Sequence, residues 1–307
     1  MCSIRGRLTL MPRAVIDVGS NAVVLAVAEP SSSGWISVLE TSAVTALGDD
    51  LRRTQRLSEQ AMTRTLLAVK QAWADARSYD APVQAWGTMA LRVAENADQF
   101  LRLAAEQGTP VRVLSGEDEA RLGLLSVALD PTFEGERVSL IDVGGHSTEV
   151  GTYDRANHRV LFMKSLPIGT LALRTHCEEG GCLAGGSLLR ACAAADEAIG
   201  FASRPGEAGA VVAVGASATN LVALSQQLER WNPARVHGSA LSYEEVSRLV
   251  ASLSPMSDEQ RATLVGLEKG REFTIHLGAL LLERCLHALR AESMRISVRV
   301  AACDDRR

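Results

Sequence analysis

AVIDVGSN at residues 14–21 returns in altered form as LIDVGGHS at residues 140–147. Each stretch completes an apolar run, Arg13–Asp17 or Val138–Asp142, that predicts a buried strand ending in a glycine turn. A second apolar run follows each turn, and two such runs joined by a tight turn predict a β-hairpin. The two halves of the chain therefore share one signature, and an internal repeat of this kind decides the fold.

The repeat predicts two similar α/β domains that face each other across a cleft, with one glycine turn from each domain pointing into it. The loop PTFEGE at 131–136 is the expected boundary, so the predicted domains are residues 1–130 and 131–307. Further strands are expected at residues 42–47, 83–86, 111–114, 160–165, 211–214 and 294–300. Helices are expected at residues 58–79, 96–108, 117–129, 187–202, 218–230, 243–253 and 271–291.

The composition is that of an ordinary globular chain, with 47% hydrophobic and 22% charged residues among 307. Its 32 basic and 36 acidic residues give a net charge of −4, unlike the strongly basic domains that bind nucleic acids. The sequence has no apolar run long enough to span a membrane, and its first residues lack the features of a secretory leader. We therefore expect a cytoplasmic protein without a nucleic-acid or membrane partner.

The shared signature also has a chemical meaning. Glycines let backbone N–H groups approach phosphate oxygens without a clash at Cβ. The aspartate at the strand end can hold hydrated Mg²⁺, which prefers one or two carboxylates together with phosphate and water. One such turn alone is equally typical of an ordinary hairpin. Two turns, one in each half, favour an anion site in the cleft.

Five further segments extend this pattern: GTMALR at 87–92, LSGEDEARL at 114–122, SLPIG at 165–169, GASAT at 215–219 and GRE at 270–272. With the two glycine turns, they resemble the motifs of the exopolyphosphatase/guanosine pentaphosphate phosphohydrolase (Ppx/GppA) family, in the same order. The resemblance implies an α/β fold of two RNase H-like domains, of the actin, sugar-kinase and Hsp70 type, flanking a central cleft. Homodimers are common in that family, and the chain resembles its short members, which lack a helical C-terminal domain.

The resemblance implies a hydrolase that uses Mg²⁺ to release the terminal phosphate of polyphosphate or of guanosine pentaphosphate. Glu119 would be the general base that takes a proton from the attacking water. Asp142 would hold Mg²⁺, and Glu149 would support the metal or the water. Arg92 would clamp a phosphate through its guanidinium group. The remaining substrate contacts would come from Asn21, Gly144, Gly145, His146, Ser147, Ser217 and Arg271.

The sequence departs from the family pattern on the side that would hold the phosphates. Ala22, Val24 and Ala46 stand where polar or basic residues are usual, and Ala218 replaces a glycine of the third glycine loop. Two alternatives therefore stay open beside the active hydrolase. One is a weakened member that binds phosphate or nucleotide and regulates, and the other is an actin-like ATPase or sugar kinase.

The short form predicts a preference for short polyphosphate or a nucleotide over long chains. Met11 directly precedes the first strand, so residues 1–10 are expected to be dispensable for folding. His146 stands where the family has glycine, a residue that serves positive φ or close phosphate approach. A histidine ring pointing into the cleft would donate a hydrogen bond to phosphate and strengthen binding at low pH. A ring pointing away would have no role in binding.

Overall fold

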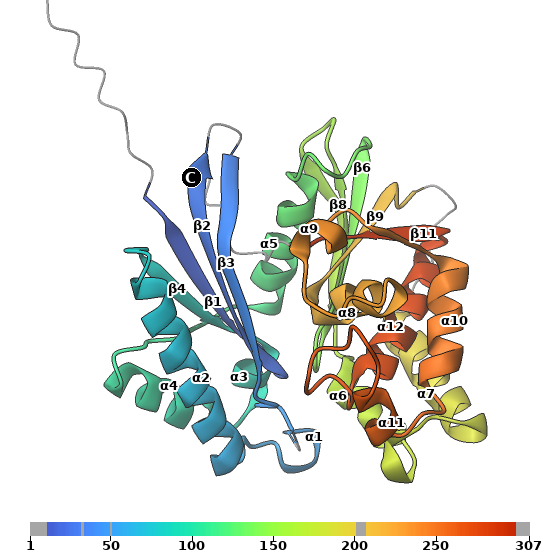
Figure 1. Cartoon of the computed structure of the whole chain (residues 1–307), viewed down its shortest axis with the longest axis horizontal. Coiled ribbons are helices and arrows are strands. Elements are labelled where there is room, and N and C mark those ends of the chain that lie inside the picture. Colours follow the sequence, from blue (N-terminus) through green and yellow to red (C-terminus); the bar gives the residue numbers. More distant parts are fainter. Residues whose placement is uncertain (1–10, 32–33, 50, 201–206, 299–307) are drawn as a thin grey trace, which may run out of the picture.

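The computed structural model describes residues 11–31, 34–49, 51–200 and 207–298, which form two α/β halves side by side (Figure 1). The first half contains a sheet in the order β3-β2-β1-β4-β5. Its strands are β1 (Arg13–Val18), β2 (Ala22–Ser31), β3 (Gly34–Val44), β4 (Val83–Gly87) and β5 (Arg112–Val113). β1, β2 and β3 are antiparallel neighbours, whereas β4 runs parallel to β1 and β5 runs parallel to β4.

The second half repeats this topology. Its sheet has the order β10-β11-β9-β6-β7-β8, so that β8-β7-β6-β9-β11 corresponds to β3-β2-β1-β4-β5. β6, β7 and β8 are antiparallel neighbours, and β9 and β11 continue in parallel. The strands are β6 (Arg137–Val143), β7 (Thr148–Asp154), β8 (Arg159–Leu166), β9 (Ala210–Val214), β10 (Ala240–Ser242) and β11 (Ser293–Ile296). The shared strand order confirms the predicted repeat of two RNase H-like units.

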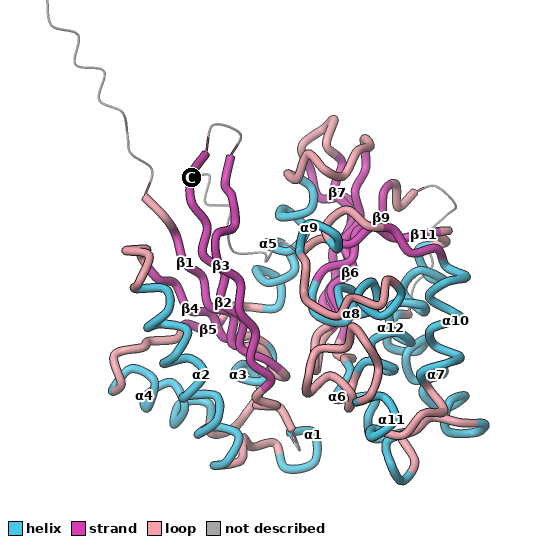
Figure 2. Tube along the Cα trace, in the orientation of Figure 1, coloured by secondary structure: helices cyan, strands magenta, loops and turns pink. Residues whose placement is uncertain are grey.

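Helices cover the outer faces of both sheets (Figure 2). The first half has α1 (Leu51–Thr54), α2 (Glu59–Arg77), α3 (Met89–Val93) and α4 (Ala97–Glu106). The second half has α6 (Thr170–Leu173), α7 (Gly185–Ile199), α8 (Gly215–Ser225), α9 (Pro233–Val236), α10 (Tyr243–Leu253), α11 (Asp258–Ala262) and α12 (Ile275–Leu289). α12 is buried along nearly its whole length because it packs against α7, α8 and α10.

The helix α5 (Gly116–Ala128) lies between the two sheets in Figures 1 and 2. Its buried residues Leu124 and Val127 form a cluster with Leu140 of β6 and Tyr153 of β7, so the helix packs on the second sheet. Its chain connection nevertheless comes from β5 of the first sheet. The division after residue 130 stays a prediction, but packing places α5 with the second half.

Strand alternation in the second sheet fixes where the acidic side chains point. On β6, Val138 and Leu140 pack with α5, whereas Ile141 and Val143 pack with the helices on the opposite face. Because side chains alternate along a strand, Asp142 lies on the α5 side. The same period places Glu149 of β7 on that side. The sequence pattern of the two strands therefore turns both carboxylates toward α5.

Most predicted elements are confirmed, with α10 at its predicted bounds of 243–253. The predicted bounds of the third strand were wrong, because β3 spans Gly34–Val44 and not 42–47. Its exposed residues include Ile36 and Val38 as well as polar ones, so no alternation of apolar and polar residues marks the strand. Asn96 does not cap α4 with its side chain, which instead bonds both the N–H and the C=O of Leu57. The expectation for residues 1–10, and the end of the last predicted strand at 299–300, lie outside the described residues.

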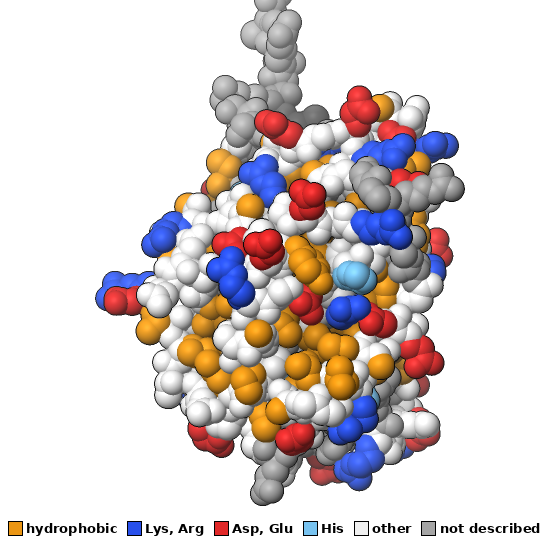
Figure 3. Space-filling view, turned by 90° about the vertical axis from the view of Figure 1, so that its right-hand side faces the viewer, with side chains coloured by type: hydrophobic (Ala, Val, Ile, Leu, Met, Phe, Trp, Pro, Cys, Tyr) orange, Lys and Arg blue, Asp and Glu red, His pale blue; other side chains and the backbone are white. Residues whose placement is uncertain are grey.

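The helices and one face of the molecule bear on the expected membrane and protein partners. Among the described residues, no helix is long and apolar enough to cross a membrane. The face of the second half seen in Figure 3 carries hydrophobic side chains near its middle, with charged groups around them. Homodimer formation stays a prediction.

Candidate active site

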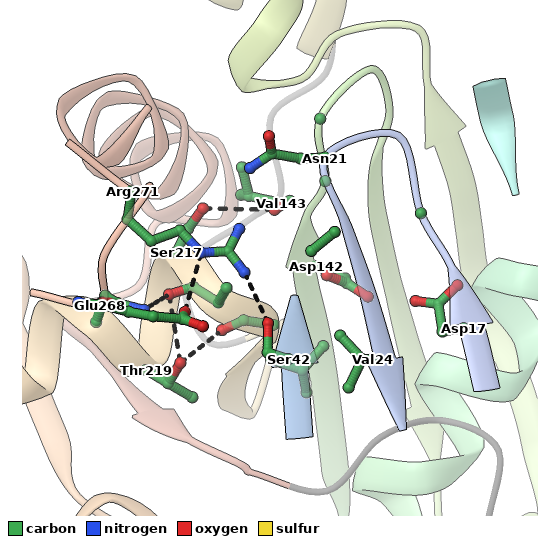
Figure 4. A pocket seen from close by; sticks show the side chains of 18 of the residues that line it. Asp17, Asn21, Val24, Ser42, Asp142, Val143, Ser217, Thr219, Glu268 and Arg271 are labelled. Atoms are coloured by element: carbon green, nitrogen blue, oxygen red, sulfur yellow. Dashed lines mark hydrogen bonds and ion pairs between the residues drawn. The ribbon is translucent and has the colours of Figure 1, made fainter. Parts of the chain in front are cut away.

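A cavity of about 560 Å³ lies between the two halves, and both glycine turns line it (Figure 4). The first half contributes residues of β1, β2, β3 and the turn at 19–21. The second half contributes the turn at 144–147, the start of α8 and the segment 266–275. A cavity of this size and position is the expected place for a substrate.

The two glycine turns are alike at the level of single atoms. Gly19 N–H donates to the carbonyl of Ala22, and Gly144 N–H donates to the carbonyl of Ser147, both at 2.9 Å. A Cβ on either glycine would lie 3.0 Å from that same carbonyl oxygen. Glycine is therefore favoured at both positions by this close approach within the turn. Among the described residues of the second turn, Gly144, Gly145 and His146 all have ordinary negative φ, so His146 carries no backbone strain.

Asp17 and Asp142 occupy equivalent positions at the ends of β1 and β6, and both line the cavity. Burial raises the pKa of Asp17 to about 8, with smaller contributions from Glu119 and Asp142. Burial and then Glu119 raise the pKa of Asp142 to about 7. The equivalence of the two aspartates is visible in the repeat, but only Asp142 was predicted to have a role.

Glu119 reaches the cavity from the first turn of α5. This helix begins at Gly116 because Ser115 caps it, its Oγ accepting a hydrogen bond from the Asp118 N–H at 3.0 Å. Burial raises the pKa of Glu119, whereas a hydrogen bond and the charge of Arg92 lower it. The distance between Arg92 Nη1 and Glu119 Oε2 is 2.6 Å.

Arg92 lies on α3 of the first half and also donates to the carbonyl of Leu114 at 3.0 Å. Its guanidinium therefore has a carboxylate partner rather than an open face toward the cavity, and Arg92 is absent from the described lining residues. Phosphate binding by Arg92 stays a prediction, and it would require the Glu119 contact to be shared or exchanged.

Glu149 is 3% exposed on β7. Ser165 Oγ donates to its Oε1 at 2.7 Å, and Ser147 contributes a second hydrogen bond. Burial raises the pKa of Glu149 well above its ordinary value, with the charges of Glu119 and Asp142 adding to the effect. Four carboxylates, those of Asp17, Glu119, Asp142 and Glu149, therefore act on one another around the same end of the cavity.

The geometry fits a divalent cation held by few protein ligands. The Oδ1 atom of Asp17 is buried and has no hydrogen-bond partner, and its carboxylate faces that of Asp142 across the cavity (Figure 4). Among the described residues, no three histidine, cysteine or acidic side chains form a ready-made metal site. A cation here would thus take one or two carboxylates and complete its shell with phosphate and water, as Mg²⁺ does.

The other predicted contacts also line the cavity: Asn21, Gly144, Gly145, His146, Ser147, Ser217 and Arg271. Ser217 Oγ donates to the carbonyl of Val143 at 3.5 Å. Arg271 donates to Glu268 Oε2 at 3.0 Å and, across to the first half, to Ser42 Oγ at 3.3 Å. Glu40 and Glu268, whose charges repel each other, also line the cavity from opposite halves, and no sequence motif indicated either residue.

The chain is similar to known proteins over most of its length. A model of the Ppx/GppA phosphatase family matches residues 26–301. The chain belongs to the Ppx/GppA phosphatase family. Exopolyphosphatase 1 of Mycobacterium bovis is 26% identical over 287 residues, which cover 92% of this chain and 83% of that relative.

Solved structures show the same fold. The crystal structure of the Aquifex aeolicus Ppx/GppA family member is similar with a TM-score of 0.77 at 27% identity, covering 95% of this chain and 94% of that one. An exopolyphosphatase from Cytophaga hutchinsonii has a TM-score of 0.81 at 20% identity, with 94% of each chain covered. The predicted family and fold class are therefore confirmed, and the family is one of phosphatases.

Proposed function

We propose that this protein hydrolyses terminal phosphoanhydride bonds of polyphosphate or guanosine pentaphosphate. The observation that carries the proposal is the group of four carboxylates, Asp17, Glu119, Asp142 and Glu149, at the end of the cavity where the two glycine turns meet. Such a group suits the attack of a water molecule on a phosphorus atom whose oxygens are held by backbone amides and a cation.

Glu119 is the proposed base. Its carboxylate is partly buried, and Arg92 holds one of its oxygens at 2.6 Å, which leaves the other free to orient and deprotonate a water. The backbone amides of the turns at 19–21 and 144–147 would bind phosphate oxygens. Arg271 would add a positive charge at the far side of the cavity.

Asp142 and Glu149 would hold Mg²⁺, with Asp17 close enough to take part. The bound cation supplies positive charge that offsets the charge of the phosphate oxygens. Its charge would also stabilise the ionised carboxylates, whose pKa values are raised first by burial and then by mutual repulsion. The acidic cluster and the substrate would therefore bind the cation together.

A second candidate is the weakened member that binds phosphate compounds without efficient turnover. The excess of carboxylates over cationic groups in the cavity supports this alternative. Of the described residues that line the cavity, Arg271 is the only one with a guanidinium or ammonium group, against seven carboxylates: Asp17, Glu40, Glu119, Asp142, Glu149, Glu229 and Glu268. A polyanion would thus depend heavily on its bound cations.

A phosphate-release assay separates these functions. The full chain is incubated with tripolyphosphate, long-chain polyphosphate, guanosine pentaphosphate and ATP, each with Mg²⁺. Phosphate release from tripolyphosphate, long-chain polyphosphate or guanosine pentaphosphate by the wild type, and its loss in the Glu119→Gln variant, supports the proposed hydrolysis. Binding of these compounds without release supports the weakened member, and release from ATP alone supports the ATPase alternative. A cytoplasmic location is part of the same proposal.

A further inference from the structure

The two glycine turns contact each other where they line the cavity, and His146 lies beside this contact. Its side chain is buried, with the residue 5% exposed. A methyl group on Gly48, which belongs to the first half, would lie 2.5 Å from Cε1 and 2.7 Å from Nδ1 of His146. The imidazole ring therefore occupies the space that any side chain at position 48 would need.

Each partner in this contact is fixed to its own half. In the first half, Gly48 N–H donates to the carbonyl of Ser20 at 2.8 Å, which ties the loop after β3 to the first glycine turn. In the second half, Leu171 N–H donates to the carbonyl of Gly145 at 2.7 Å. A Cβ on Gly169 would lie 2.5 Å from the backbone N of His146, so the segment at 169–171 supports the second turn closely.

A second contact runs beside the first. A Cβ on Gly145 would lie 3.0 Å from Cβ of Ser20 and 3.4 Å from Cβ of Asn21. The second turn thus meets the first half at two adjacent places, the loop at Gly48 and the first turn, and only the contact with Gly48 is made by a large side chain. Ser20, Asn21, Gly145 and His146 all line the cavity, so a change in the distance between the two turns would change its shape.

We propose that His146 is a positioning residue whose ring fits against Gly48 and holds the two glycine turns in register. The turns must act on the same phosphate from opposite halves, so their relative position decides whether that phosphate is aligned with Glu119. In this role the ring acts through its shape and is not a phosphate ligand. The catalytic part of this inference rests on the proposed hydrolysis, whereas the contact itself does not.

The test is a double-mutant cycle of Gly48→Ala, His146→Ala and the combined variant, in the full chain. Gly48 has no positive φ, and a Cβ there would lie 2.5 and 2.7 Å from two ring atoms of His146 but 3.1 Å from Ser20 Cβ, so the ring accounts for most of the strain. We expect Gly48→Ala to lower kcat about 10-fold or more, because a displacement of about 1 Å costs up to about 10²-fold. His146→Ala should lower kcat about 10-fold, with KM changed less than about threefold. The combined variant should recover at least the activity of His146→Ala alone.

The matched control is Gly48→Ala combined with His287→Ala, since His287 is exposed on α12 and its removal should rescue nothing. The urea midpoint and the calorimetric affinity for tripolyphosphate are measured on the same variants. These two measurements report the contact between His146 and Gly48 even if no substrate is hydrolysed. In that case the proposed function fails, and the positioning role of the ring is still tested.

Three results would overturn the inference. The first is a Gly48→Ala variant with wild-type stability and activity. The second is a combined variant as impaired as the product of the single effects. The third is tripolyphosphate affinity that strengthens from pH 8 to pH 5.5 in the wild type but not in His146→Ala, which would make the ring a phosphate ligand.

Discussion

Arg92 and Glu119 form an ion pair that joins the two halves of the molecule. Arg92 lies on α3, which packs in the core of the first half, and Glu119 lies on α5, which packs on the second sheet. Their 2.6 Å contact is therefore made across the boundary between the halves, beside the cavity. The proposed base is thus held by a cation from the opposite half.

Glu119→Gln should lower kcat about 10²–10⁴-fold, the usual contribution of a general base, with little change in KM. Glutamine keeps the shape of the side chain and can still accept the Arg92 hydrogen bond, so the loss reports proton transfer. Glu117→Gln, on the exposed side of the same helical turn, is the matched control. Wild-type turnover in Glu119→Gln would remove this residue from the mechanism.

Arg92→Met should move the acid limb of the pH–rate profile to higher pH. The guanidinium lowers the pKa of Glu119 through a hydrogen bond and its charge, so its removal raises that pKa. A base with a higher pKa is protonated, and thus inactive, over a wider acidic range. The profile of kcat/KM against pH measures this shift. A limb at unchanged pH would mean that the group titrating there is not Glu119.

Tripolyphosphate should be a better substrate than long-chain polyphosphate, compared as kcat/KM per chain end. The cavity wall carries the uncharged Val24, and Glu40, Glu229 and Glu268 also line the cavity. A long polyanion would meet these carboxylates. Initial rates on size-fractionated chains check this, and a strong preference for long chains would contradict it.

Glu40→Gln should remove a decrease in the free energy of unfolding that occurs as the pH rises. Burial, and then the charge of Glu268, raise the pKa of Glu40 from 4.5 to about 7 in the folded chain. Between these values the folded state binds more protons than the unfolded state, so the free energy of unfolding falls as pH rises from about 4.5 to about 7. The variant should therefore have a higher Tm than the wild type at pH 8 and a smaller difference at pH 4.5. Glu29→Gln, exposed on β2, should change neither value.

Arg261→Met should destabilise the second half by about 3–5 kcal/mol, the range for breaking a buried ion pair. Arg261 is fully buried, and its guanidinium donates to Asp258 and to the carbonyls of Leu253, Gly181, Met256 and Glu272. Urea unfolding measures the change, with Arg248→Met on the surface of α10 as control. A loss below about 1 kcal/mol would show that the pair contributes little.

The repeat of strand, aspartate and glycine turn could be predicted from sequence because it depends on local order along the chain. Apolar runs joined by glycine turns predicted both hairpins, and the helix that carries Glu119 was predicted at residues 117–129. The packing of α5 on the second sheet could not be predicted, since its apolar face fits either sheet until the chain is folded. The partner of Arg92 was missed for the same reason, because 27 residues separate the two side chains.

The position of His146 shows a different limit. Its place within a glycine turn suggested either a phosphate ligand or an idle substitution. The contact with Gly48 depends on a loop nearly a hundred residues earlier, in the other half of the chain. Only the structure shows that a glycine in one half leaves room for a ring from the other.

The connection of α5 to both halves has a consequence for the regulation of the site from outside the cavity. This helix is joined by the backbone to the first sheet and by side-chain packing to the second, so the halves cannot rotate relative to each other without moving Glu119 against Arg92. The basicity of that carboxylate therefore depends on interdomain angle. A ligand that turned one half from its outer surface would change the reaction rate without entering the cavity.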